Sequence, residues 1–121
     1  MDKLLSGRRS LVVEDEMLVL IMIEDMLADL GCESVTAAAT INQALILIDA
    51  QIFDFAMLDM NLNGNQTYAV ADALVARGVP FVFSTGYSQQ SLREGYRNRP
   101  ILRKPFKQRD LVDSVTRLLA H

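Results

Sequence analysis

Residues 53–62 read Phe-Asp-Phe-Ala-Met-Leu-Asp-Met-Asn-Leu, a short apolar run that ends at the carboxylate of Asp59. A run of this length without polar alternation is typical of a strand covered on both faces in a parallel sheet. Polar residues that follow such a strand lie at the carboxyl edge of the sheet, where α/β proteins form their sites. Asp59 is therefore the first candidate functional residue.

Other short apolar runs lie on either side of this strand, separated by segments with helical apolar spacing. The runs are Leu11-Val12-Val13, Phe81-Val82-Phe83 and Ile101-Leu102, with a weaker strand around Ser34-Val35-Thr36. Alternating strands and helices predict a parallel sheet with helices on both faces and right-handed crossovers. We expect one α/β domain over residues 1–121, with its core at about 9–119. The segment 88–97 is the weakest helix, because it has few apolar residues and contains a glycine.

Several of the helical segments carry end signals. The stretch Thr40-Ile41-Asn42-Gln43 has the form of a capping box before an apolar stripe. Gly31 and Gly78 each follow a stripe and supply a C-terminal stop. These signals set the expected helix boundaries.

The composition excludes several classes of protein. The 121 residues include 12 Lys+Arg and 15 Asp+Glu, a net charge of −3, so no basic excess favours nucleic acid as a direct partner. The single cysteine, Cys32, allows no internal disulfide and favours a reducing compartment, and the single histidine, His121, rules out a Ser-His-Asp triad. No signal peptide or membrane-length apolar stretch is present. We expect a cytoplasmic protein without a membrane partner.

Polar residues follow each of the principal strands, and a parallel sheet brings them to one edge. They are Glu14-Asp15-Glu16, Asp59, Ser84-Thr85-Gly86 and Arg103-Lys104-Pro105. Two charges 4 Å apart interact by roughly 4 kcal/mol at an effective dielectric near 20, so clustered carboxylates require a cation. Oxygen ligands without His or Cys suit Mg²⁺. The alternative is that single strand-end acids, such as Asp15 or Glu16, are only helix caps facing water.

A carboxylate beside Mg²⁺ and a lysine can attack a phosphoryl group and form an aspartyl phosphate. The metal and the ammonium neutralise the charge on the phosphoryl oxygens. Phosphoryl transfer depends mainly on positioning and charge stabilisation, so this chemistry needs no acid-base histidine.

These motifs resemble the signature set of response regulator receiver domains of two-component signalling, and the resemblance spans the whole chain. They are Leu11-Val12-Val13-Glu14-Asp15-Glu16, Met57-Leu58-Asp59-Met60-Asn61-Leu62, Thr85-Gly86 and Lys104-Pro105-Phe106. The resemblance implies that Asp59 is the phosphoacceptor, with Thr85 and Lys104 contacting the phosphoryl oxygens. It implies Mg²⁺ ligands from the carboxylates of Glu14, Asp15 and Asp59 and the backbone carbonyl of Asn61. It also implies a cis Lys104-Pro105 bond.

The family resemblance further implies a flavodoxin-like (βα)5 sandwich whose five-stranded parallel sheet has the order 2-1-3-4-5. It implies a partner that donates phosphate, either a sensor histidine kinase or a histidine phosphotransfer protein. Many receivers also form homodimers through the face made by the fourth helix, fifth strand and fifth helix. Because no output domain is evident in the chain, we expect a single-domain response regulator that signals by protein contact. No enzymatic activity is expected beyond self-phosphorylation and self-dephosphorylation.

A narrower resemblance concerns Pro80-Phe81-Val82-Phe83-Ser84-Thr85-Gly86-Tyr87. This stretch is similar to the Pro-Phe-x-Phe-Ala-Thr-Gly-Tyr motif of a receiver subgroup, with Ser84 in place of alanine. That subgroup is found in alphaproteobacteria, often with kinases of the HWE/HisKA2 type. The resemblance therefore implies a kinase of this type as the partner.

One position departs from the family pattern. Receivers commonly carry Tyr or Phe three residues before the lysine of the fifth strand, and here that residue is Ile101. Isoleucine has no ring to rotate on phosphorylation. We expect the phosphorylated state to be read instead by ordering of Thr85-Gly86-Tyr87 and of the segment 88–97.

Three other interpretations stay open. In the first, the chain is a pseudo-receiver that serves only as an interaction module. In the second, it is a receiver fragment of a hybrid kinase. The third is a phosphohydrolase with an aspartate nucleophile, which is disfavoured because Asp59-Met60-Asn61 lacks the second acid of the Asp-x-Asp pattern.

Overall fold

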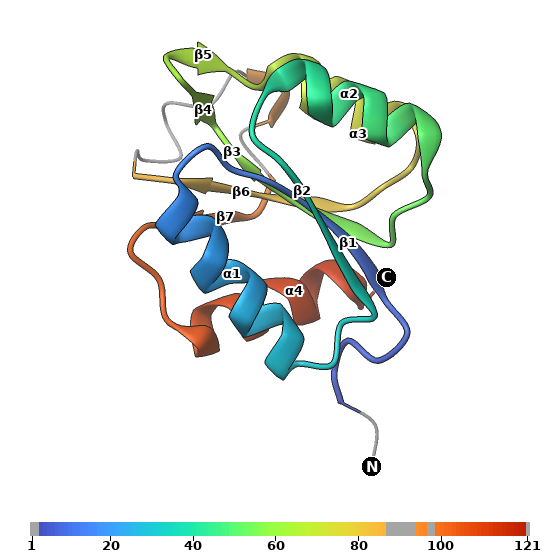
Figure 1. Ribbon diagram of the computed structural model, residues 1–121, viewed down its shortest axis with the longest axis vertical. Helices are drawn as coiled ribbons and strands as arrows, with labels where there is room; N and C mark the ends of the chain where they lie inside the picture. Colours follow the sequence, from blue (N-terminus) through green and yellow to red (C-terminus); the bar gives the residue numbers. More distant parts are fainter. Residues whose placement is uncertain (1–2, 87–93, 97–98, 121) are drawn as a thin grey trace.

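Five strands form one parallel sheet at the centre of the molecule (Figure 1). The computed structural model describes residues 3–86, 94–96 and 99–120. In the order in which they lie side by side, the strands are β2 (Ser34–Ala38), β1 (Arg9–Val13), β3 (Phe55–Asp59), β6 (Phe81–Thr85) and β7 (Ile101–Arg103). Because β6 and β7 are the fourth and fifth strands of this sheet, the expected order 2-1-3-4-5 and the flavodoxin-like fold are confirmed.

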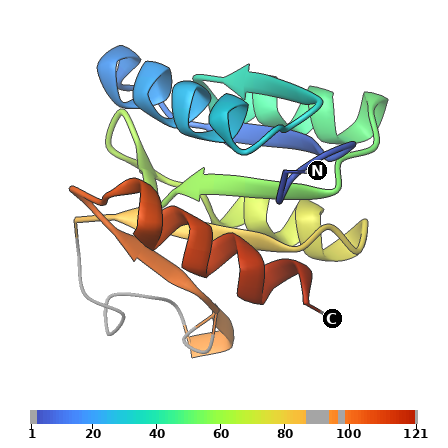
Figure 2. The same ribbon diagram turned by 90° about the horizontal axis from the view of Figure 1, so that it is seen from below.

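Helices cover both faces of the sheet, as expected (Figure 1, Figure 2). One face carries α1 (Met17–Asp29) and α4 (Gln108–Leu119), and the other carries α2 (Ile41–Ala50) and α3 (Tyr68–Ala76). Within the described part of the chain, no helix is long and apolar enough to cross a membrane. The sheet is therefore the middle layer of a three-layer sandwich.

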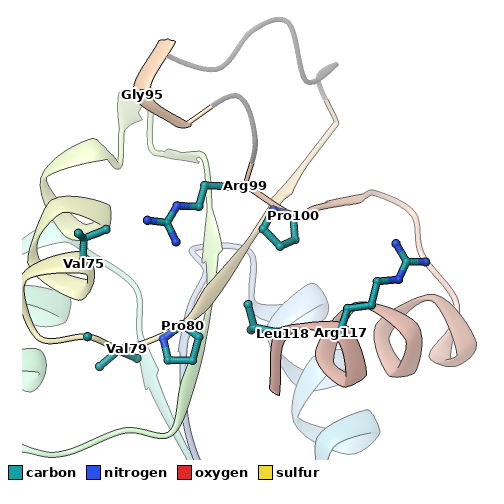
Figure 3. Close-up of a pocket in the computed structure, with 9 residues that line it drawn as sticks. Val75, Val79, Pro80, Gly95, Arg99, Pro100, Arg117 and Leu118 are labelled. Atoms are coloured by element: carbon teal, nitrogen blue, oxygen red, sulfur yellow. The ribbon is translucent and has the colours of Figure 1, made fainter. Parts of the chain in front are cut away.

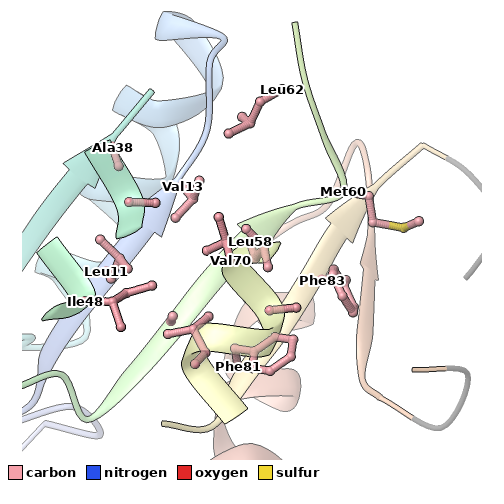
Figure 4. Close-up of a cluster of buried hydrophobic side chains, with 14 of the residues drawn as sticks. Leu11, Val13, Ala38, Ile48, Leu58, Met60, Leu62, Val70, Phe81 and Phe83 are labelled. Atoms are coloured by element: carbon pink, nitrogen blue, oxygen red, sulfur yellow. The ribbon is translucent and has the colours of Figure 1, made fainter. Parts of the chain in front are cut away.

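The hydrophobic core is divided by the sheet into two halves. On the α2 and α3 side, Figure 4 shows Leu11 and Val13 from β1, Leu58 from β3, and Phe81 and Phe83 from β6. The alternate positions of the same strands pack on the other side, toward α1 and α4; they are Val12, Phe55, Met57 and Val82. Burial on both faces is the physical reason why these strands are apolar without alternation.

The expected helix over 88–97 lies largely outside the described residues. Within it, the structure describes only a short 3-10 helix, η2 (Glu94–Tyr96). Tyr96 is buried, and its ring packs edge-on against Phe83 with 5.8 Å between the ring centroids. Ile101 pairs with Phe83 in the sheet and is half-buried. Within the described residues, aromatic rings from η2 and from α3 (Tyr68) thus pack against this part of β6, and β7 contributes an aliphatic side chain.

A small hairpin between β3 and α3 was not expected from the sequence. It consists of β4 (Asn61–Leu62) and β5 (Asn65–Gln66), joined by Asn63 and Gly64. Both turn residues have positive φ, 52° and 86°, as a type I′ turn requires. The hairpin follows directly after Asp59, so its geometry determines what lies beside the phosphoacceptor candidate.

The helix boundary signals are confirmed. The hydroxyl of Thr40 accepts a hydrogen bond from the backbone N–H of Gln43 at 3.1 Å, and the Gln43 side chain accepts one from the backbone N–H of Ala39 at 2.9 Å. Gly31 has a φ of +86° after the end of α1. The single cysteine, Cys32, is half-buried and packs against the α1 and α4 side of the core.

Two isoleucines of α2 provide a test of this packing. Ile48 is 3% exposed and Ile46 is 68% exposed, two residues apart on one helix. We expect Ile48→Ala to lower the free energy of unfolding by about 2–5 kcal/mol, because it leaves a cavity under the sheet. Ile46→Ala is the matched control and changes it by less than about 0.5 kcal/mol. Urea unfolding followed by circular dichroism measures both, and equal losses would contradict the assigned face.

Candidate functional site

The polar residues at the strand ends meet in one cleft of about 410 Å³. It lies at the carboxyl ends of β3 and β6 and beside the loop after β1. Its lining residues are Asp15, Glu16, Asp59, Asn61, Asn63, Gly64, Thr85, Gly86 and Lys104. Glu14 lies directly behind this lining and is 1% exposed. All six residues named as site candidates from the sequence therefore come together at this edge.

Lys104 links the carboxylates on neighbouring strands. Its ammonium Nζ lies 2.8 Å from Oε1 of Glu14 and 3.1 Å from Oδ2 of Asp59, and Oε1 of Glu16 is more distant at 3.9 Å. The backbone N–H of Lys104 donates to the carbonyl of Thr85 at 2.9 Å, which ties the lysine to the end of β6. The Lys104-Pro105 peptide is cis, as the resemblance implied.

Hydrogen bonds hold both the side chain and the main-chain carbonyl of Asp59. Its Oδ1 accepts a hydrogen bond from the backbone N–H of Asn61 at 3.1 Å. Its main-chain carbonyl accepts a hydrogen bond from the hydroxyl of Thr67 at 2.6 Å. The next N–H, that of Met60, donates to the carbonyl of Ser84 at 3.1 Å. Asp59 is buried, with only its carboxylate facing the cleft.

Four carboxylates gather closely enough to offer oxygen ligands to one cation. Glu14, Asp15, Glu16 and Asp59 can each place one oxygen so that all lie within 4.8 Å of one another. Oδ2 of Asp15 accepts a hydrogen bond from the backbone N–H of Asn63 at 3.0 Å, which fixes its position at the cleft. An all-oxygen donor set with one nearby ammonium leaves an excess of negative charge, and Mg²⁺ fits this donor chemistry.

Burial and crowding perturb the two central titratable groups. Burial raises the pKa of the Glu14 carboxyl above its ordinary value of 4.5, the nearby Asp59 raises it further, and Lys104 offsets only part of this. Burial by itself would lower the pKa of Lys104, but the adjacent carboxylates of Glu14 and Asp59 outweigh it, and the pKa is raised. The lysine therefore stays a cation at neutral pH.

A larger cavity lies away from these carboxylates. It has a volume of about 740 Å³ and lies near the start of β6 and β7, at the other end of the sheet. Figure 3 shows Val75 and Val79 on the α3 side of this cavity and Leu118 on the α4 side. Its charged lining residues are Arg99 and Arg117, and no carboxylate lines it. The carboxylate cluster of Asp15, Glu16 and Asp59 thus lies in the smaller cleft and not in this cavity.

Sequence reasoning missed three residues, two that line the cleft and one buried behind it. The turn residues Asn63 and Gly64 line it, and the Asn-Gly pair is a strong hairpin signal that was available in the sequence. Thr67, whose hydroxyl contacts the Asp59 carbonyl, had no signal because its side-chain direction depends on tertiary packing.

Comparison with known protein families identifies the family to which this fold belongs. A family model for the response regulator receiver domain matches residues 10–116, nearly the whole chain. The chain belongs to the receiver family. Receiver domains of this family are signalling modules of two-component systems and interact with histidine kinases.

Two receivers of known structure, SdrG in two conformations and the receiver domain of PA1611, are similar to this chain. SdrG from Sphingomonas melonis Fr1 is 40% identical with a TM-score of 0.83, and the match covers 93% of this chain and 96% of SdrG. The BeF3-activated conformation of SdrG, from Pseudomonas melonis Fr1, is 39% identical with a TM-score of 0.82, over 94% and 98%. The receiver domain of the sensor histidine kinase PA1611 from Pseudomonas aeruginosa PAO1, with a magnesium ion in its active-site cleft, is 28% identical with a TM-score of 0.77, over 96% and 100%.

A curated relative is longer than this receiver. The transcriptional regulatory protein PdtaR of Mycobacterium tuberculosis is 29% identical over 112 residues, which are 89% of this chain. The match covers 55% of PdtaR, so the chain spans about half the length of this relative. The similarity therefore concerns only about half of PdtaR.

The buried Glu14 gives a stability prediction for the metal-free receiver. Because its pKa is raised, the ionised carboxylate destabilises the fold at neutral pH, and Glu14→Gln should raise the free energy of unfolding by on the order of 1 kcal/mol. This gain is present above the raised pKa and disappears below pH 4.5, where both folded and unfolded states hold the proton. Urea titrations in chelator at a series of pH values measure it.

Glu16→Gln is the matched control, because this side chain is 66% exposed. We expect a change of less than about 0.5 kcal/mol at any pH. If Glu14→Gln instead destabilises the protein at pH 7, the attraction between Glu14 and Lys104 outweighs the burial of the carboxylate, contrary to the direction of its pKa shift.

Proposed function

We propose that this receiver accepts a phosphoryl group on Asp59 from a histidine kinase or a histidine phosphotransfer protein, in a Mg²⁺-dependent reaction. The observation that carries the proposal is the position of the Asp59 carboxylate, 3.1 Å from the Lys104 ammonium in an open cleft. A nucleophile, a charge-neutralising cation and additional carboxylates thus occupy one site. The similarity to SdrG, which has a BeF3-activated conformation, supports the same assignment.

The chemistry is an in-line displacement at phosphorus. A carboxylate oxygen of Asp59 attacks the phosphorus of a phosphohistidine, the P–N bond breaks, and its electron pair stays on the leaving imidazole nitrogen. Lys104 neutralises charge on one phosphoryl oxygen. Thr85, which lines the same cleft, supplies a hydroxyl donor to another. The side-chain oxygen of Asn61 accepts a hydrogen bond from the backbone N–H of Gly64 at 2.8 Å, and its amide offers no acid for hydrolase chemistry.

Mg²⁺ would be held by the carboxylates of Glu14, Asp15 and Asp59 and the backbone carbonyl of Asn61. When bound, it supplies positive charge that neutralises the phosphoryl oxygens in the transition state. The donor chemistry of the cluster supports this assignment, as does the magnesium ion in the cleft of the PA1611 receiver. Asp15 keeps its place through the Asn63 backbone, independently of Lys104.

We propose that residues 1–121 form a single receiver domain whose output is a protein contact and which has no enzymatic activity beyond its own phosphorylation and dephosphorylation. A phosphoryl group adds a charge of about −1.5 to −2 and biases a two-state surface. We also propose a cytoplasmic location, since a single unpaired cysteine, Cys32, is consistent with a reducing compartment.

The test is phosphorylation by acetyl phosphate with Mg²⁺, followed by intact mass. We expect one phosphoryl adduct per chain, stable in acid and labile in base, because the acyl phosphate forms at a single carboxylate. Asp59→Asn should abolish the adduct, and Lys104→Ala should reduce its rate of formation by at least about tenfold through loss of charge stabilisation. Chelation of Mg²⁺ should prevent the reaction in the wild-type chain.

Asp29→Asn is the matched control, because this carboxylate is exposed at the far end of α1 and makes none of the contacts of the cleft. It should phosphorylate at the wild-type rate. A wild-type chain that forms no adduct would favour the pseudo-receiver, and multiple turnover of small phosphate esters would favour the hydrolase.

We propose a kinase of the HWE/HisKA2 type as the donor. The support is the stretch from Pro80 to Tyr87, which differs from the subgroup motif only at Ser84. Phosphotransfer from one purified kinase of this type and one of the ordinary type, at equal concentrations, tests the proposal. Equal rates, or faster transfer from the ordinary type, would contradict it.

We also propose that the receiver forms a homodimer through the face that contains β7 and α4. The proposal rests on the family resemblance, because many receivers form homodimers through the face made by the fourth helix, fifth strand and fifth helix. Sedimentation velocity with and without BeF3 tests it. A monomer under both conditions would contradict it.

A further inference from the structure

Thr67 occupies the N-cap position of α3 without capping the helix through its side chain. The first turn is closed by its main-chain carbonyl, which accepts hydrogen bonds from the N–H groups of Val70 and Ala71 at 3.0 and 3.1 Å. The hydroxyl instead donates to the main-chain carbonyl of Asp59 at 2.6 Å. Threonine at an N-cap ordinarily uses this hydroxyl as an acceptor for the helix, as Thr40 does at the start of α2.

The bond lies at the point where the sheet no longer fixes the backbone. Asp59 is the last residue of β3, and only one peptide beyond it, the N–H of Met60, still bonds to the neighbouring strand. The carbonyl of Met60 accepts a hydrogen bond from the backbone N–H of Thr67 at 3.1 Å. Thr67 thus holds two successive peptide carbonyls, one with its hydroxyl and one with its backbone.

These contacts determine where the nucleophile points. The Asp59 side chain extends from a backbone that is fixed at this carbonyl, and its Oδ2 lies 3.1 Å from the ammonium of Lys104, the residue after β7. A displacement of about 1 Å of a reacting group can cost about a hundredfold in rate. Thr67 is 1% exposed, so water cannot readily replace a hydroxyl lost from this position.

We propose that Thr67 is a positioning residue for phosphoryl transfer to Asp59, acting through its hydroxyl on the main-chain carbonyl of the phosphoacceptor. This inference deepens the proposed function and rests on it. It places the determinant eight residues after the nucleophile, at the start of α3, outside the set of strand-end residues that contact the phosphoryl group or the metal.

The test compares three variants. Thr67→Val removes the hydroxyl at nearly constant volume, Thr67→Ser keeps it, and Thr40→Val removes a true capping hydroxyl far from the cleft. With acetyl phosphate and saturating Mg²⁺, Thr67→Val should form the adduct about tenfold more slowly than the wild type, by loss of one positioning hydrogen bond. Thr67→Ser should stay within about twofold of the wild-type rate. Thr40→Val should lose stability to urea but keep the wild-type rate.

The combination of rates separates positioning from a general loss of stability. Thr67→Val at the wild-type rate, or Thr67→Ser as slow as Thr67→Val, overturns the inference and leaves the proposed function standing. A Thr40→Val variant slowed as much as Thr67→Val overturns it too, because stability alone then explains the rate. A wild-type chain without any adduct overturns both proposals. Should Thr67→Val fail to fold, Thr67→Ala carries the same expected loss.

Discussion

The ion pairs of Lys104 hold together a group of side chains whose own charges repel one another. Glu14 and Asp59 both contact its ammonium within 3.1 Å, and both come from strands buried in the middle of the sheet. Neither carboxylate can move away, because the apolar residues before it are packed on both faces. The fold therefore uses the hydrophobic free energy of the core to keep like charges together at its edge. The site stays reactive because the packed sheet prevents the two carboxylates from moving apart.

The position of that lysine depends on features remote from it in the sequence. The backbone N–H of Lys104 donates to the carbonyl of Thr85. Elsewhere in the cleft, the Asn63–Gly64 turn donates one backbone N–H to Asp15 and one to the side chain of Asn61. Backbone donors are rigid and carry no net charge. The turn orients Asp15 without neutralising it, so the excess negative charge stays available for a cation.

The sequence predicted most of the sheet and the site, because both depend on short-range patterns. Apolar runs followed by polar residues located the strand ends, and a parallel sheet necessarily gathers those ends, Asp59 among them. The β4–β5 hairpin was missed although its Asn-Gly signal was present, since four residues of strand are too short to show alternation. Thr67 was beyond prediction for a different reason. A buried hydroxyl has several acceptors within reach, and only the packed structure decides which one it contacts.

The ring of Tyr96 has a consequence for how this molecule can be observed. It stacks on Tyr68 of α3 with 5.6 Å between centroids, and its hydroxyl donates to the carboxylate of Asp72. The chain contains no tryptophan, three tyrosines and five phenylalanines, so tyrosine dominates its near-ultraviolet absorption and emission. Two of the three form this stacked pair, which joins η2 to α3. The tyrosine spectrum of the protein therefore reports on the contact between η2 and α3.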